Sequence, residues 1–168
     1  TVGNAYFHGW GVERSYEQAH HWYKLAAEQG FVGGQYELCK FYSKDRGEIK
    51  KDEKQAVHWS RLAAEQGLAD AQVSMAVFFA LGSGVEQDYE QAAYWMRLAA
   101  EQGTVGAQHV LGELYRHGLG VEENHEQAVH WNRLAADQGE AAAQYSLASA
   151  YGRGEGVEQD DEIGRAHV

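Results

Sequence analysis

The sequence predicts an all-α solenoid, an array in which pairs of antiparallel helices stack along one direction. The motif Leu-Ala-Ala-Glu-Gln-Gly, with Asp for Glu in the last copy, occurs four times and ends at Gly30, Gly67, Gly103 and Gly139. A tryptophan precedes each copy at a constant distance, and both series advance by 37, 36 and 36 residues. A period in this range is typical of arrays in which each unit buries its apolar face against its neighbours.

The first helix of each unit is predicted from apolar residues at helical spacing, as the third repeat illustrates. Ala71, Met75 and Phe79 form a stripe along one helix face. The glycine-rich segment 81–85 then interrupts this pattern, because glycine permits a tight turn that a residue with a Cβ resists. We therefore expect a helix that ends near residue 81 and a short turn after it.

The second helix of each unit begins at a capping signal and ends at a glycine. Asp88 is followed by Gln91, the spacing at which the first side chain caps the helix and the second lies at its third position. Trp95 and Leu98 belong to the buried stripe, and Gly103 is expected to end the helix in the left-handed conformation. Equivalent capping pairs with other strong N-cap residues are Ser15 and Gln18, Asp52 and Gln55, and Asn124 and Gln127.

The recurring tryptophans could pack between helices or form an aromatic box for a ligand. Their strict placement, once in each repeat, favours packing. The alanine pair in each copy of the motif would let neighbouring helices approach closely, as stacked hairpins require. The tryptophans concerned are Trp22, Trp59, Trp95 and Trp131.

Both ends of the array are expected to be incomplete, so that the chain is a fragment of a longer array. Thr1 falls inside a first helix when the repeats are aligned, and Ile163 to Val168 match nothing in the other repeats. The latter six residues look like a translated sequencing adapter, and we exclude them from the predicted fold. The array is expected to span 1–162, with repeats at about 1–32, 33–69, 70–105, 106–141 and 142–162, the first and last being truncated.

The repeat pattern resembles that of the Sel-1-like repeat family. The resemblance implies a right-handed α-solenoid of antiparallel helix pairs, with about four to five repeats of 36–37 residues, and a role as a scaffold that brings proteins together. Tetratricopeptide repeats are the near alternative, but the 36-residue step, the Gly-x-Gly-Val turn and the absence of proline favour the Sel-1-like class. The fourth repeat carries the pattern most fully, at Leu111, Gly112, Tyr115, Gly118, Gly120, Val121, Ala128, Trp131, Ala135, Ala136 and Gly139.

Charge and hydropathy exclude several classes of partner. The formal net charge of −11 disfavours nucleic acid and anionic membranes, since both require clustered Lys and Arg. No stretch approaches the roughly 20 apolar residues of a membrane span. Cys39 is the single cysteine, so no internal disulfide can form, and we interpret it as a small buried residue.

The sequence predicts no enzyme activity, no cofactor and no metal site. His21, His58 and His130 share one repeat position, but equivalent positions in stacked helix pairs lie too far apart to bind one zinc ion. The common motifs of serine hydrolases, zinc peptidases and P-loop nucleotide-binding proteins are missing. The glycine-rich turns lie between helices and lack the strand-to-helix context of a phosphate-binding loop.

Candidate partner-binding residues lie where the repeats differ, because packing positions repeat while recognition positions are free to vary. Two such positions, four residues apart, share one face of each first helix. By analogy with related helical arrays this face would line a groove that takes an extended peptide or a partner helix, although it could also be unconstrained surface. The candidates are Tyr36, Lys40, Val73, Val77, His109, Glu113, Tyr145 and Ser149.

The second repeat has a longer turn, rich in lysine, in place of Gly-x-Gly-Val. In an otherwise acidic chain this turn is either a solvated loop or a docking site for an acidic partner. The candidate docking residues are Lys44, Arg46, Lys50, Lys51 and Lys54.

Three functions are compatible with these observations. The first is a protein-interaction scaffold or adaptor that binds a peptide or partner protein along the solenoid groove. The second is a regulatory repeat region of a larger enzyme or quality-control complex whose catalytic part lies outside this sequence. The third, a small-molecule or glycan-binding solenoid, would need a converging pocket of a kind that open grooves seldom form. Neither the partner nor the cellular compartment can be read from these residues.

Overall fold

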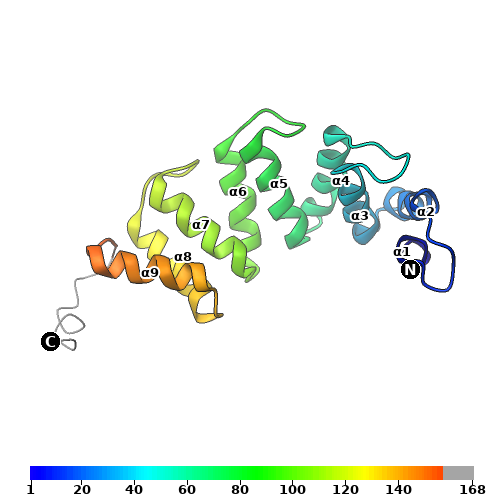
Figure 1. Cartoon of the computed structure of the whole chain (residues 1–168). Helices are drawn as coiled ribbons and strands as arrows, with labels where there is room; N and C mark the ends of the chain where they lie inside the picture. Colours follow the sequence, from blue (N-terminus) through cyan, green and yellow to red (C-terminus); the bar gives the residue numbers. More distant parts are fainter. Residues whose placement is uncertain (157–168) are drawn as a thin grey trace. The chain divides into compact units, whose positions relative to one another are not determined.

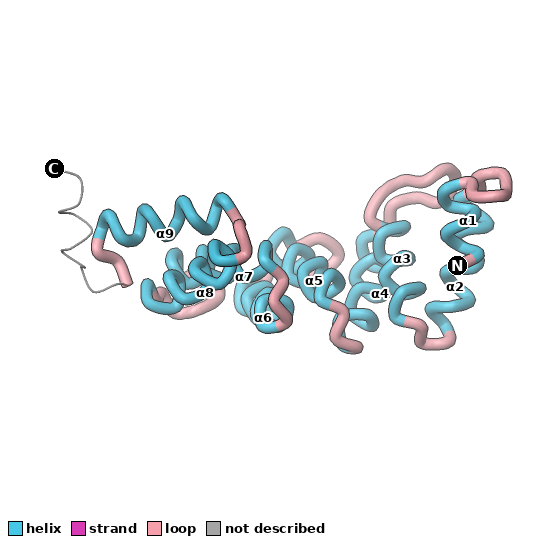
Figure 2. Tube along the Cα trace, turned by 90° about the horizontal axis from the view of Figure 1, so that it is seen from below, coloured by secondary structure: helices cyan, strands magenta, loops and turns pink. Residues whose placement is uncertain are grey.

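The computed structural model describes residues 1–156, and over these residues the fold is all-α (Figure 1). The segment Ile163 to Val168, which resembles a translated adapter, lies outside the described residues. Each of the first four repeats contributes a first helix and a second helix, joined by the loops seen in Figure 2, and α9 is the first helix of the fifth repeat. The helices are α1 (Val2–His8), α2 (Tyr16–Glu28), α3 (Val32–Tyr42), α4 (Glu53–Glu65), α5 (Ala69–Leu81), α6 (Tyr89–Glu101), α7 (Val105–His117), α8 (His125–Asp137) and α9 (Ala141–Arg153).

The chain divides into two compact units. The first comprises residues 1–88 with α1 to α5, and the second begins at Tyr89 and contains α6 to α9. Within each unit, every helix packs against the next one in the sequence. The fold is thus built from neighbour-to-neighbour contacts, as the repeat period predicts.

The predicted caps form at the second helices. The side chains of Ser15, Asp52 and Asn124 accept hydrogen bonds from the backbone N–H groups of the glutamines three residues later, with donor–acceptor distances of 3.2, 3.0 and 2.9 Å. Each cap satisfies a backbone donor that has no partner inside the helix. The sequence signal for where these helices begin is therefore confirmed.

Two glycines of the second unit show that glycines of the repeat motif are required for different reasons. Gly139, which follows α8, has φ +92° and open space where a Cβ would lie, so it serves only the left-handed conformation. Gly120, in the turn after α7, has φ +69°, and a Cβ there would overlap the backbone carbonyl of Tyr89 at the start of α6. The turn of one repeat therefore packs directly on the second helix of the preceding repeat.

The tryptophan prediction holds in part. Trp95 is buried, with 6% of its surface exposed, and Trp59 and Trp131 are half-buried. Trp22 is 41% exposed, so the expected packing is only partial at this position. Trp22 lines a cavity together with residues of α1 and α3, which leaves part of its side chain uncovered.

Candidate functional site

In the first unit, the candidate face comprises Tyr36 and Lys40 on α3 and Val73 and Val77 on α5. The Lys40 ammonium lies 5.1 Å from the centroid of the Tyr36 ring, so these two residues share a face as the i,i+4 spacing predicts. Burial raises the pKa of Tyr36, and a hydrogen bond with Ser74 acts against this rise. Val73 is half-buried, whereas Val77 is 44% exposed.

In the second unit, two of the four candidates are held by other side chains. His109 Nδ1 lies 2.8 Å from Oδ1 of the buried Asn132. Burial acts to raise the pKa of Glu113, but hydrogen bonds from Arg116 and Ser146 outweigh it, and the pKa lies below its ordinary value. Glu113 is therefore ionised at neutral pH and links α7 to α9 through its 3.0 Å hydrogen bond from Ser146 Oγ.

The other two candidates of the second unit lie on α9. Tyr145 is 78% exposed, and Ser149 is half-buried. Over residues 1–156 no second helix follows α9, whereas the equivalent His109 contacts Asn132 on α8, so the exposure of Tyr145 does not by itself indicate a partner. Val77, in the interior of the array, is the apolar candidate best placed to contact another molecule.

The lysine-rich turn of the first unit contains one residue that holds it to the core, Arg46, and four exposed lysines. The Arg46 guanidinium lies 5.0 Å from the Phe7 ring centroid and 5.1 Å from that of Phe41, and Arg46 Nη2 donates to the Lys40 carbonyl at 3.4 Å. Arg46 therefore fixes the turn to the core by cation–π contact and is not directed outward. Its outward residues, all exposed, are Lys44, Lys50, Lys51 and Lys54.

The residues considered for metal binding or reactivity do not converge. His21, His58 and His130 are exposed on separate second helices. Over residues 1–156, no three His, Cys, Asp or Glu side chains come together in a way that could hold a metal ion. Burial raises the pKa of the Cys39 thiol, which disfavours the reactive thiolate.

None of the helices described here has the length and apolar character needed to cross a bilayer.

A ladder of glutamine hydrogen bonds, which sequence reasoning missed, connects successive repeats, and the glutamines of the first helices in it, Gln35, Gln72 and Gln108, are buried. In the second unit, Gln108 Nε2 donates to the Ala100 carbonyl at 3.2 Å, and Gln138 Nε2 donates to Gln108 Oε1 at 2.8 Å. In the first unit, Gln35 receives the corresponding hydrogen bond from Gln66 at 2.7 Å. The available signal was a glutamine recurring beside the apolar stripe of each first helix, at positions 35, 72, 108 and 144.

Replacing Gln108 by leucine is expected to lower the free energy of unfolding by about 1–3 kcal/mol, because it leaves the Ala100 carbonyl and the Gln138 amide without this partner. Gln144→Leu is the matched control, since Gln144 makes the equivalent carbonyl contact at 3.2 Å but is exposed. Urea denaturation followed by circular dichroism measures both changes. Equal losses for the two variants would contradict a special role for the buried ladder.

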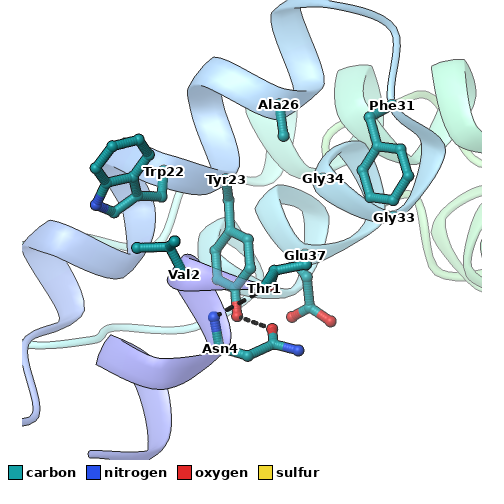
Figure 3. Close-up of a pocket in the computed structure, with 11 residues that line it drawn as sticks. Thr1, Val2, Asn4, Trp22, Tyr23, Ala26, Phe31, Gly33, Gly34 and Glu37 are labelled. Carbon is teal, nitrogen blue, oxygen red and sulfur yellow. Dashed lines mark hydrogen bonds between the residues drawn. The ribbon is translucent and has the colours of Figure 1, made fainter. Parts of the chain in front are cut away.

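A cavity of about 320 Å³ lies in the first unit between α1, α2 and α3 (Figure 3). Its walls are mainly apolar and aromatic, formed by Trp22 and Tyr23 of α2 and by Phe31, which precedes α3. The Tyr23 hydroxyl donates to Asn4 Oδ1 at 2.6 Å, which holds α1 to α2 at one end of the cavity. The lining also includes three small residues, Ala26, Gly33 and Gly34, and one acidic residue, Glu37.

The model of the Sel1 repeat matches five segments, at residues 2–31, 32–68, 69–104, 105–140 and 141–167. No curated protein matches the chain. Among solved structures, the chain is similar to c5321, a protective antigen of uropathogenic Escherichia coli strains that displays an SLR fold, with 42% identity, a TM-score of 0.90, and coverage of 95% of this chain and 34% of the other.

Two further structures are similar to this chain. A Sel1 repeat protein from Oxalobacter formigenes has 38% identity and a TM-score of 0.90, with coverage of 96% of this chain and 66% of that one. Helicobacter pylori cysteine rich protein B has 21% identity and a TM-score of 0.62 over 80% of this chain and 96% of its own, which indicates a shared fold alone. The chain thus spans about a third of c5321 and about two thirds of the Oxalobacter protein.

Proposed function

Because the chain belongs to the Sel1 repeat family, whose members are generally protein-interaction scaffolds, we propose that it is a non-catalytic scaffold or adaptor. Its ligand in this proposal is a peptide or partner protein, not nucleic acid or a small molecule. The contact residues are those first-helix positions that differ between repeats, considered separately in each of the two units.

The exposure of Val77, an apolar residue at a position that differs between the repeats, is the observation that carries this proposal. Apolar residues at repeating first-helix positions, such as Met75 and Leu111, are fully buried. Val77, at a position that differs between the repeats, is 44% exposed, although an exposed apolar side chain adds nothing to the packing of its own helix. Tyrosine is enriched among the residues that dominate binding energy at protein interfaces, because it offers a large apolar area together with a hydrogen-bonding hydroxyl.

The eight candidate positions have different roles in this proposal. Tyr145 and Val77 supply apolar contact area, whereas the Tyr36 ring is already covered in part by Lys40. His109 and Glu113 each form a side-chain hydrogen bond within the array, with Asn132 and Ser146 respectively. In this proposal they position the face and supply little of the contact area. The four exposed lysines of the turn add an electrostatic contact with acidic residues of the same partner, and Arg46 does not belong to this contact.

The proposal is tested by the affinity of a partner recovered from the source cells with the wild-type chain. Tyr145→Ala is expected to raise the dissociation constant by about tenfold or more, and a tenfold rise corresponds to the loss of about 1.4 kcal/mol of binding free energy. The matched control is Tyr94→Ala, because Tyr94 is 53% exposed but lies on the second helix α6. A Lys50→Glu, Lys51→Glu double variant tests the turn in the same assay.

Isothermal titration calorimetry measures the affinities, and circular dichroism checks that each variant remains folded. Unchanged affinity for Tyr145→Ala, together with a loss for Tyr94→Ala, would contradict the proposed face.

A further inference from the structure

The helix α5 is apolar on its exposed side as well as on its buried side. After Asp70 it contains no charged residue, whereas a surface helix of a folded protein normally presents polar side chains to water. Val73 is half-buried, Val77 is 44% exposed and Leu81 is 70% exposed. Because these three residues are four positions apart, they form one row along the helix, which we call the α5 apolar row.

The α5 apolar row belongs to the third repeat alone and lies in the interior of the array, with a full repeat before α5 and another after it. Single exposed apolar residues are ordinary, but polar residues occupy the places of Val77 and Leu81 in every other repeat. The fold itself therefore does not require an apolar side chain at either place. The residues at the place of Val77 are Asn4, Lys40, Glu113 and Ser149, and those at the place of Leu81 are His8, Lys44, His117 and Arg153.

Two lysines of the second repeat lie on the flank of this row. The Tyr36 hydroxyl is hydrogen-bonded to Ser74, so α3 lies beside α5 within the first unit. Lys40 and Lys44 occupy the places on the α3 side that the two exposed residues of the row occupy on α5. The Lys40 ammonium is paired with Glu37 at 2.6 Å. The side of the row that faces α3 is thus basic.

The charge of Lys44 is not compensated within the protein. Lys44 is exposed and forms no ion pair among residues 1–156. The adjacent carboxylate, that of Asp45, accepts a hydrogen bond from the Lys51 backbone N–H at 2.7 Å. Because the net charge of the chain is −11, an acidic segment is attracted to this flank and repelled by most of the remaining surface.

We propose that the α5 apolar row binds an amphipathic helix of a partner protein, with acidic residues along the flank that lies over α3. This inference rests on the proposed scaffold function and specifies its ligand. Residues four positions apart in a helix rise by about 6 Å, so an apolar row of the partner can lie along Val73, Val77 and Leu81 as the ridges of packed helices do. Its acidic flank then faces Lys40 and Lys44.

Two capped synthetic peptides, each about four helical turns long, are the probes for the complete chain. Both carry leucine at every fourth position, and one flank holds glutamate in the first peptide and lysine in the second. The net charge of the chain favours the lysine peptide. We nevertheless expect the glutamate peptide to bind tighter by about threefold or more in isothermal titration calorimetry, with a preference that declines at high salt.

Two pairs of variants separate the apolar contact from the charge. Leu81→Ala should weaken binding of the glutamate peptide by about fivefold or more, because the contact area of an exposed leucine is lost. Leu25→Ala is its matched control, since Leu25 is 38% exposed on the second helix α2 of the same unit. Lys44→Glu should abolish the preference for the glutamate peptide. Lys24→Glu makes the same change in net charge on α2 and should preserve this preference.

Equal or tighter binding of the lysine peptide would overturn the proposal, and so would losses of equal size for Leu81→Ala and Leu25→Ala. The absence of saturable binding of the glutamate peptide at millimolar concentrations would overturn it as well. Failure of the scaffold proposal is a separate result, because that proposal is tested with the recovered partner. A recovered partner that loses affinity with Val77→Ala, but not with Leu81→Ala or Lys44→Glu, would support the scaffold and overturn only the acidic helix.

Discussion

Replacing Trp95 by alanine is expected to lower the free energy of unfolding by about 3–5 kcal/mol, the range for truncating a large buried aromatic side chain. The indole is 6% exposed, so the substitution leaves a cavity in well-packed surroundings. Urea denaturation followed by far-ultraviolet circular dichroism measures the loss, and the intrinsic fluorescence of the remaining four tryptophans reports whether both units unfold together.

Trp22→Ala is the matched control for this prediction. Trp22 occupies the same repeat position but is 41% exposed, and we expect its truncation to cost less than half as much as that of Trp95. Equal losses for the two variants would show that Trp22 is as well packed as Trp95, in contradiction to its greater exposure.

Gly120→Ala is the second large effect, with an expected loss of about 2–5 kcal/mol. A left-handed backbone conformation costs alanine roughly 1–2 kcal/mol, and overpacking typically costs a further 1–3 kcal/mol. The second contribution arises because the new methyl group would overlap the Tyr89 carbonyl, so that the turn must move away from α6.

Gly139→Ala separates these two contributions. Gly139 has φ +92° and no neighbour within 4 Å of the new methyl group, so only the conformational cost of roughly 1–2 kcal/mol applies. Thermal and urea denaturation of the two variants side by side give the difference. A loss at Gly139 equal to that at Gly120 would argue against close packing of the turn on α6.

The helix boundaries and the repeat architecture could be predicted from the sequence because their causes are local. A capping side chain such as Asn124 acts on a backbone group three residues away, and a glycine such as Gly139 acts on its own dihedral angles. Their recurrence at one period then reveals the stacking of neighbouring units. Each of these is a property of a short segment that recurs along the chain.

The burial of individual tryptophans could not be predicted in the same way. Trp22 and Trp95 occupy one position of the same pattern, yet 41% of Trp22 and 6% of Trp95 are exposed. The glutamine ladder was also missed, because Gln108 and Gln138 are 30 residues apart and each resembles an ordinary polar residue of a helix. Sequence position alone does not show that Gln108 is buried.

For the candidate face, too, the local features could be predicted from the sequence and the contacts between elements could not. The spacing of Tyr36 and Lys40 predicts a shared face, and their contact is present. The spacing does not show that His109 is hydrogen-bonded to Asn132 or that Arg46 lies over two aromatic rings. These contacts join different elements of the structure, so they do not follow from the spacing within one helix. Only the structure distinguishes residues that are hydrogen-bonded to the framework, such as His109, from exposed ones such as Val77.

The central claim is that a partner contacts the first-helix positions that do not repeat, and site-specific photo-cross-linking tests it most directly. The photoreactive residue p-benzoylphenylalanine is placed at position 145 or 77 of the candidate face, or at position 94 on α6 as the control. After irradiation with the recovered partner, mass spectrometry identifies the cross-linked products. Covalent adducts from positions 145 and 77, with little from position 94, are the predicted result. Adducts from position 94 alone would contradict the account.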